Sequence, residues 1–142
     1  MMKKSYDLKH VVSFEETNLV GNVYFVNHIR WQGKCREMFL HDHARSVLAE
    51  LENGNLALVT LNCSCEYFEE LKAFDEVLVK MFLEKTVQNK IAMRFEYYHV
   101  TSHTEKLIAQ GKQEIACMGK SAQGYIPVLI PKDLQTALSE FS

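Results

Sequence analysis

The chain has 142 residues, of which 47% are hydrophobic, and this length and composition predict one domain spanning residues 1–142. Its 18 acidic and 16 basic side chains are scattered and leave a formal net charge of -2, which gives no electrostatic basis for binding nucleic acid. The sequence shows neither the apolar core of a secretion signal near Met1 nor an uncharged apolar run of the roughly 20 residues that cross a bilayer. A cytoplasmic protein outside the membrane is therefore expected.

The first predicted element is a strand over residues 6–14, in which Leu8, His10 and Val12 alternate with charged or small residues. His10 shares the apolar side of this strand, so we predict that it is half-buried and hydrogen-bonded rather than a catalytic base. The alternation stops in residues 15–21, which form a polar turn ending in a glycine.

A long amphipathic helix is predicted from about residue 23 to residue 41, because apolar side chains from Val26 to Leu40 recur at helical spacing. A shorter helix is predicted over residues 44–51 and stops near Gly54, where the chain tolerates positive φ. The start of a helix exposes unpaired N–H groups and the positive end of the helix dipole. The junction between the polar turn and the long helix is therefore the expected place for chemistry.

The rest of the chain is predicted to form strands, because its apolar residues are β-branched or aromatic and alternate. The four predicted strands cover residues 56–67, 76–86, 91–101 and 107–118. Short polar turns between them favour an antiparallel meander that wraps the long helix. One face of such a sheet is covered by the helix, whereas its edges and second face need a partner, so we expect a homo-oligomer.

The cysteines and histidines do not predict a metal site. Cys63 and Cys65 fall on one face of a strand, but free cysteines in a reducing compartment more often pack as small apolar side chains. His41 and His43 are two residues apart, which does not place them on one helical face, and we expect them to be exposed.

A resemblance to a known family rests on the segment EETNLVGNVYFVNHIRWQGKCREMFL, on Glu66-Tyr67 and on Phe74-Asp75-Glu76. These residues resemble hot-dog-fold thioesterases of the 4-hydroxybenzoyl-CoA thioesterase type, and more narrowly those that accompany iterative polyketide synthases of enediyne pathways. The resemblance covers nearly the whole chain and implies an α+β hot-dog fold, a tetramer built as a dimer of dimers, and no metal or cofactor. It also implies that the partner is the acyl carrier protein domain of an iterative polyketide synthase.

The resemblance assigns the catalytic roles. The family usually has a catalytic aspartate at the position of Asn18, and an amide can neither attack a thioester nor act as a general base, although it can donate and accept hydrogen bonds. The enediyne-associated members are similar to this chain in having the asparagine together with an arginine on the central helix, here Arg36. The resemblance implies that the Phe25 N–H receives the thioester oxygen and that Arg36 stabilises negative charge.

Structural alternatives remain for each of these residues. Asn18 can form an Asx turn or cap the helix, and Arg36 can pair with a carboxylate or stay solvated. Tyr24, Asn27 and His28 are predicted to line the entrance for the acyl chain, although Tyr24 is equally suited to the core and His28 to an exposed helix position.

Three functions follow from this pattern. The main prediction is hydrolysis of a polyunsaturated β-ketoacyl thioester on a carrier protein, after which the free β-keto acid loses carbon dioxide to give a methyl ketone. The alternatives are a general acyl-CoA thioesterase and a non-catalytic acyl-binding protein that has lost its carboxylate. Asn18 favours the first or the third.

An apolar tunnel for the acyl chain is expected among Trp31, Met38, Phe39, Tyr67 and Phe68.

Overall fold

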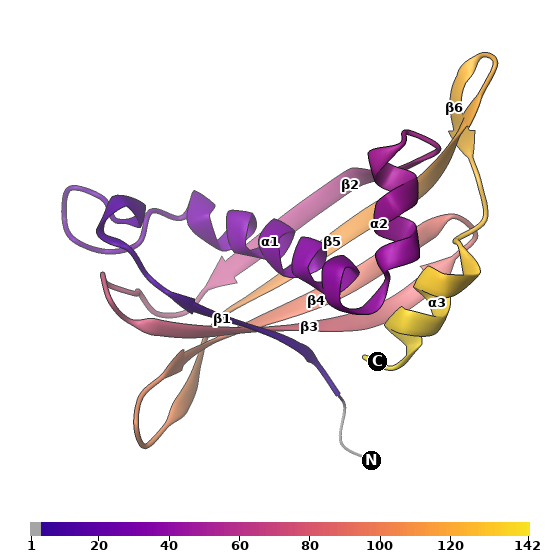
Figure 1. Cartoon of the computed structure of the whole chain (residues 1–142). Helices are drawn as coiled ribbons and strands as arrows, with labels where there is room; N and C mark the ends of the chain where they lie inside the picture. Colours follow the sequence, from indigo (N-terminus) through magenta and orange to yellow (C-terminus); the bar gives the residue numbers. More distant parts are fainter. Residues whose placement is uncertain (1–3) are drawn as a thin grey trace.

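The computed structural model describes residues 4–142 as one curled antiparallel sheet with a long helix on its concave side (Figure 1). The strands are β1 (Tyr6–Val11), β2 (Leu56–Tyr67), β3 (Glu76–Val87), β4 (Lys90–Val100), β5 (Glu105–Ser121) and β6 (Gly124–Pro127). The helices are α1 (Val26–His43), α2 (Arg45–Glu52) and α3 (Lys132–Ser139), and a 3-10 turn, η1, covers Phe14–Glu16.

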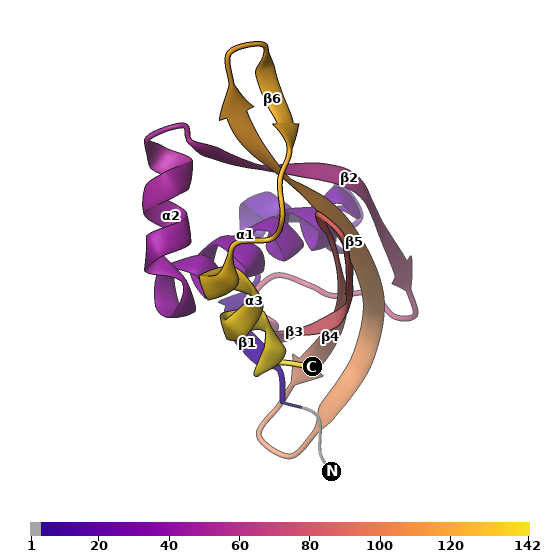
Figure 2. The same ribbon diagram turned by 90° about the vertical axis from the view of Figure 1, so that its right-hand side faces the viewer.

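The core forms where α1 lies against the sheet. Trp31, Cys35 and Phe39 recur every four residues on α1 and are fully buried. Alternate residues of the central strands face them, and these are Val77, Val79 and Met81 of β3 and Ile91, Met93, Phe95 and Tyr97 of β4. Figure 2 shows how the sheet curves around α1, so that the predicted α+β hot-dog arrangement is confirmed.

The order of the strands is β1-β3-β4-β5-β2, with β6 pairing with the end of β5. The hairpins from β3 to β5 confirm the predicted meander, but its extension to β2 is wrong, since β2 pairs with β5. The connection over residues 68–75 crosses from β2, at one edge of the sheet, to β3, which lies one strand in from the opposite edge. It is held below the start of α1, where Leu71 is buried and its carbonyl oxygen accepts a 2.8 Å hydrogen bond from Val23 N–H.

The predicted boundaries differ from the structure mainly at the N-terminal end. The first strand ends at Val11 rather than at Phe14, because Ser13 and Glu16 form a capping box that turns the chain into η1. Phe14 is consequently 77% exposed, and α1 begins only at Val26. The C-terminal elements β6 and α3 were not predicted. No helix within residues 4–142 is long and apolar enough to span a membrane.

The cysteine and histidine predictions hold in part. Cys35 and Cys117 are buried free thiols, as expected for small apolar side chains, whereas Cys63 is exposed. His41 and His43 lie exposed at the end of α1, as predicted.

Candidate active site

The polar turn before α1 is closed by Asn18. Its Oδ1 accepts a 3.1 Å hydrogen bond from Val20 N–H, and its carbonyl oxygen accepts a 3.0 Å bond from Gly21 N–H. Gly21 has a φ of 94°, a conformation that glycine adopts without strain. The Asx turn expected as the structural alternative is therefore present. It uses only the oxygen of the Asn18 side chain, and within residues 4–142 the Nδ2 group has no hydrogen-bond acceptor.

Phe25 occupies the N-cap position of α1. Within residues 4–142, its N–H makes no backbone hydrogen bond, as expected for the first residues of a helix. Its carbonyl oxygen accepts a 2.7 Å hydrogen bond from the Tyr67 hydroxyl, which attaches the end of β2 to the start of the helix. The positive end of the α1 dipole thus carries a fixed N–H donor with capacity to bind an oxygen.

A cavity of about 440 Å³ opens at this point, and we call it the helix-start cavity. Its walls include Asn18 from the turn, Tyr24, Phe25 and His28 from the helix start, and Tyr67 from β2. Four of the six residues predicted from the sequence are therefore brought together.

The carboxylates on this cavity are Glu69 and Glu70, and both are exposed. Glu69 also forms an ion pair of 2.6 Å with Lys106. Neither carboxylate occupies the position of Asn18.

His28 is buried in the wall of this cavity, with only 3% of its surface exposed. The alternative of an exposed helix residue is therefore wrong. Its ring lies 4.7 Å from the ring of Tyr67, 5.0 Å from that of Trp31 and 5.5 Å from that of Tyr97, measured between centroids. Burial lowers the pKa of His28 to about 4, although the carbonyl of Phe25 opposes this effect, so the imidazole is neutral at pH 7.

Asn27 points away from the helix-start cavity. It is buried, and its Nδ2 donates a 2.8 Å hydrogen bond to the carbonyl oxygen of Glu16. It lines a separate, polar hollow together with Glu16 and Arg30. The structure therefore shows Asn27 joining η1 to α1 and does not bring it together with the other predicted site residues.

Glu16 is a partly buried polar centre that the sequence reasoning missed. Its carboxylate accepts hydrogen bonds of 2.8 Å from His10 Nε2, from Trp31 Nε1 and from the Ser13 N–H. Burial alone would raise the pKa of Glu16, but these hydrogen bonds outweigh it and hold the pKa below its usual value. The spacing of Ser13 and Glu16 is that of a capping box, which is the signal that could have revealed this role. The predicted hydrogen-bonded state of His10 is confirmed.

Arg36 lies farther along α1, about 16 Å from Phe25 at the rise of an α-helix. Its Nη1 donates to Gln113 Oε1 at 2.9 Å and to Thr60 Oγ1 at 3.3 Å, while its buried Nε has no partner within residues 4–142. No ion pair joins Arg36 to a carboxylate in this part of the chain, and burial lowers the pKa of its guanidinium. Arg36 is therefore a partly desolvated cation without an ion-pair contact in the described residues, and the neighbouring carboxylate of Glu37 opposes the effect of burial on its pKa.

Arg36 lines a second cavity of about 440 Å³, which we call the α1–α2 cavity. Its walls are mostly apolar and include Met38, Leu48, Leu51 and Leu58. Asn18 and Arg36 of one chain thus line two different cavities. Of the residues expected to form an acyl tunnel, Met38 belongs to this cavity, Tyr67 and Phe68 belong to the helix-start cavity, and Trp31 and Phe39 are core residues.

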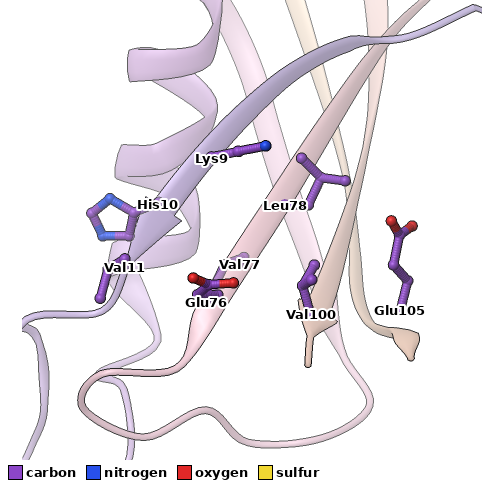
Figure 3. Close-up of a pocket in the computed structure, with 8 residues that line it drawn as sticks. All are labelled: Lys9, His10, Val11, Glu76, Val77, Leu78, Val100 and Glu105. Carbon is purple, nitrogen blue, oxygen red and sulfur yellow. The ribbon is translucent and has the colours of Figure 1, made fainter. Parts of the chain in front are cut away.

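A further hollow, of about 290 Å³, lies where the ends of β1 and β4 meet the beginnings of β3 and β5 (Figure 3). Lys9, Glu76 and Glu105 provide its charged groups and Leu78 part of its apolar wall. His10 also borders this hollow, but its Nε2 is bonded to Glu16. None of the catalytic residues predicted from the sequence lies here.

The curled sheet around α1 and the donor at its N-terminus define a hot-dog protein of the thioesterase kind. The chain belongs to the thioesterase-like superfamily, whose family model matches residues 12–138.

Comparison with solved structures and curated proteins gives more specific relatives. The chain is 48% identical to the dynemicin thioesterase, whose crystal structures are described as revealing induced-fit and allosteric effects upon polyene binding, with a TM-score of 0.93 over 97% of both chains. A 1,4-dihydroxy-2-naphthoyl-CoA thioesterase from Synechocystis shares the fold, with 19% identity and a TM-score of 0.82 over 95% of this chain and 96% of that chain.

A 1,4-dihydroxy-2-naphthoyl-CoA hydrolase from Prochlorococcus marinus (strain NATL2A) is 27% identical over 97 residues. That match spans 63% of this chain and 63% of the curated relative.

Proposed function

We propose that the protein is a thioesterase that hydrolyses a polyunsaturated β-ketoacyl thioester from the acyl carrier protein of an iterative polyketide synthase. The observation that carries this proposal is the helix-start cavity, which is lined by the side chain of Asn18 and by Phe25, whose N–H has no backbone partner within residues 4–142. The 48% identity to a polyene-binding thioesterase supports the substrate class.

In the proposed mechanism, the thioester oxygen accepts a hydrogen bond from the Phe25 N–H at the positive end of α1. The free Nδ2 of Asn18 orients the attacking water or the carbonyl group, and water adds directly to the thioester carbon. The negative charge of the tetrahedral intermediate is stabilised by the Phe25 N–H and by Arg36. Collapse of the intermediate breaks the C–S bond, and the proton lost by the attacking water passes through solvent to the departing sulfur, so that the carrier protein leaves as a free thiol. The released β-keto acid then loses carbon dioxide through its enolate, a step that a cation such as Arg36 assists.

The site is completed by a second copy of the chain. Strand β2 is an edge of the sheet, and no strand in residues 4–142 pairs with its outer side. Its apolar side chains Val59 and Leu61 are each 44% exposed. An exposed edge of this kind is suited to pairing with another strand, and two-fold symmetry makes such a pairing antiparallel.

Antiparallel pairing of two β2 strands would join the two cavities. The end of β2 at Tyr67 is hydrogen-bonded to the start of α1, whereas its beginning, at Leu58, lines the α1–α2 cavity with Arg36. Because pairing reverses one strand, the helix-start cavity of one copy faces the α1–α2 cavity of the other. Asn18 and Arg36 then act in one site, and the apolar walls of the α1–α2 cavity hold the acyl chain. The tetramer implied by the family resemblance stays a prediction that sedimentation analysis can measure.

The first experiment tests substrate and site together. A synthase loaded with its polyene chain is mixed with the protein, and the products are identified by mass spectrometry. We expect a polyene acid or methyl ketone, with release reduced about 100-fold in Asn18→Ala and in Arg36→Ala. The control, Lys34→Ala, removes an exposed cation from the same helix and is expected to keep full release. Hydrolysis of ordinary acyl-CoA without release from the synthase would support the general thioesterase, and tight binding without turnover would support the acyl-binding protein.

The shared site is tested by mixing inactive variants. In a dimer with one Asn18→Ala chain and one Arg36→Ala chain, one of the two sites keeps both native residues. Random mixing makes half of the dimers mixed, so about a quarter of the wild-type activity should return. Activity that stays at the level of the separate variants would place both residues in the site of one chain.

A further inference from the structure

His28 has hydrogen-bonding capacity that the described residues, 4–142, do not use. It is 97% buried, and neither ring nitrogen makes a hydrogen bond of ordinary geometry within residues 4–142. The carbonyl oxygen of Phe25, which accepts from Tyr67, is close enough to raise the pKa of the ring. The two nearby tyrosine hydroxyls are already engaged, since Tyr67 donates to the carbonyl oxygen of Phe25 and Tyr97 donates to the carbonyl oxygen of His28 itself, both at 2.7 Å. Buried polar groups are normally paired. An unpaired imidazole in the wall of a cavity therefore indicates a ligand that supplies the partner.

The position of His28 restricts which ligand atom can reach it. His28 follows Phe25 by three residues, so both lie on one side of α1, about one helical turn apart. A thioester oxygen on the Phe25 N–H would place the following carbons of the acyl chain near the next turn. The third carbon is two bonds beyond the thioester carbon, about 2.5 Å away, and a carbonyl oxygen on it adds about 1.2 Å.

We propose that His28 is a specificity-determining residue that donates a hydrogen bond to the oxygen on the third carbon of the acyl chain. This inference rests on the proposed thioesterase function and names the feature of the substrate that the site distinguishes. The aromatic rings of Trp31, Tyr67 and Tyr97 fix the imidazole in place without competing for its nitrogens. A chain without that oxygen leaves the donor unpaired in the complex, and a single hydrogen bond of this kind corresponds to a preference of about 10-fold.

The preference is measured as the ratio of kcat/KM for a 3-oxoacyl pantetheine thioester to kcat/KM for the unsubstituted acyl thioester of equal length. We expect His28→Phe, which keeps a ring of similar size without nitrogens, to lower this ratio about 10-fold. His28→Gln keeps an N–H donor and should recover part of the ratio. The control, His103→Phe, changes an exposed histidine in the turn between β4 and β5 and should leave the ratio at the wild-type value.

A binding measurement separates this inference from the proposed reaction. Non-hydrolysable amide analogues of the two thioesters are added to the wild-type protein, and the ring nitrogens of His28 are followed by NMR. We expect the 3-oxoacyl amide to shift these resonances and the unsubstituted amide to leave them nearly in place. If neither thioester is hydrolysed, the proposed function fails, while the NMR result still decides whether His28 binds the oxygen. An unchanged ratio in a folded His28→Phe variant, or equal shifts with both amides, would overturn the inference.

Discussion

Acidification should destabilise the fold through His28. The pKa of this histidine is about 4 in the folded protein because of burial, compared with 6.5 for an ordinary histidine. Between these two values the unfolded chain binds more protons than the folded chain, so stability falls as the pH is lowered. With these pKa values, His28 alone removes about 2.5 kcal/mol of the free energy of unfolding between pH 7 and pH 4.5.

The assay is urea denaturation of the wild type and of His28→Phe at pH 7 and at pH 4.5, at one fixed protein concentration. Carboxylates with lowered pKa values, such as Glu16, also lose stabilising interactions in acid, but they do so in both proteins. The difference between the two pH dependences therefore isolates His28. We expect the wild type to lose about 2.5 kcal/mol more than the variant over this interval.

Equal losses in the two proteins would refute this reasoning. That result would mean that the folded protein accepts a proton on His28 without cost, and hence that the ring has access to water or to a hydrogen-bond acceptor. A direct check is the chemical shift of the His28 ring as a function of pH, which should show no titration near pH 6.5.

Three further substitutions test other parts of the structure. Gly111→Ala would place a Cβ against the Nε2 of Gln32 and 2.8 Å from the backbone oxygen of Ser64, so these neighbours must move, and this should lower the free energy of unfolding by about 1–3 kcal/mol in chemical denaturation. Glu16→Gln removes a charged acceptor of the Trp31 N–H and should cost about 1.5–3 kcal/mol, seen as a lower melting temperature. Asn18→Asp keeps the Asx turn but adds negative charge beside the developing oxyanion, so turnover of the natural substrate should fall, and a large increase would contradict the proposed mechanism.

The local elements of the fold were accessible from the sequence. Strands β3 to β5 have alternating apolar residues and short turns, and α1 has apolar residues that recur at Trp31, Cys35 and Phe39, so these elements are specified without reference to distant residues. The pairing of β2 with β5 was not accessible, because it depends on how the segment over residues 68–75 crosses below α1. Helix α3 could have been predicted, since Leu134 and Leu138 lie four residues apart just after Pro131, which is typical of the start of a helix with one apolar face.

The same distinction applies to the candidate site. Asn18, Phe25 and His28 lie within one short segment, so a turn followed by a helix is sufficient to bring them to one cavity. The burial of His28 was not predicted, because Tyr67 and Tyr97 approach it from distant strands. The cavity of Arg36 likewise depends on α2 and β2.

The proposed dimer gives a physical reason for an asparagine at the position of the family's catalytic acid. Arg36 is partly buried, and within residues 4–142 its Nε has no hydrogen-bond partner and the side chain forms no ion pair with a carboxylate. In the proposed dimer, its charge would be available to stabilise an anionic intermediate. An aspartate at position 18 of the facing chain would attract that guanidinium and neutralise its field before the substrate arrives. Asn18 can orient the reacting groups through hydrogen bonds without forming an ion pair with the arginine. A neutral amide at position 18 therefore leaves the positive charge of Arg36 for the intermediate.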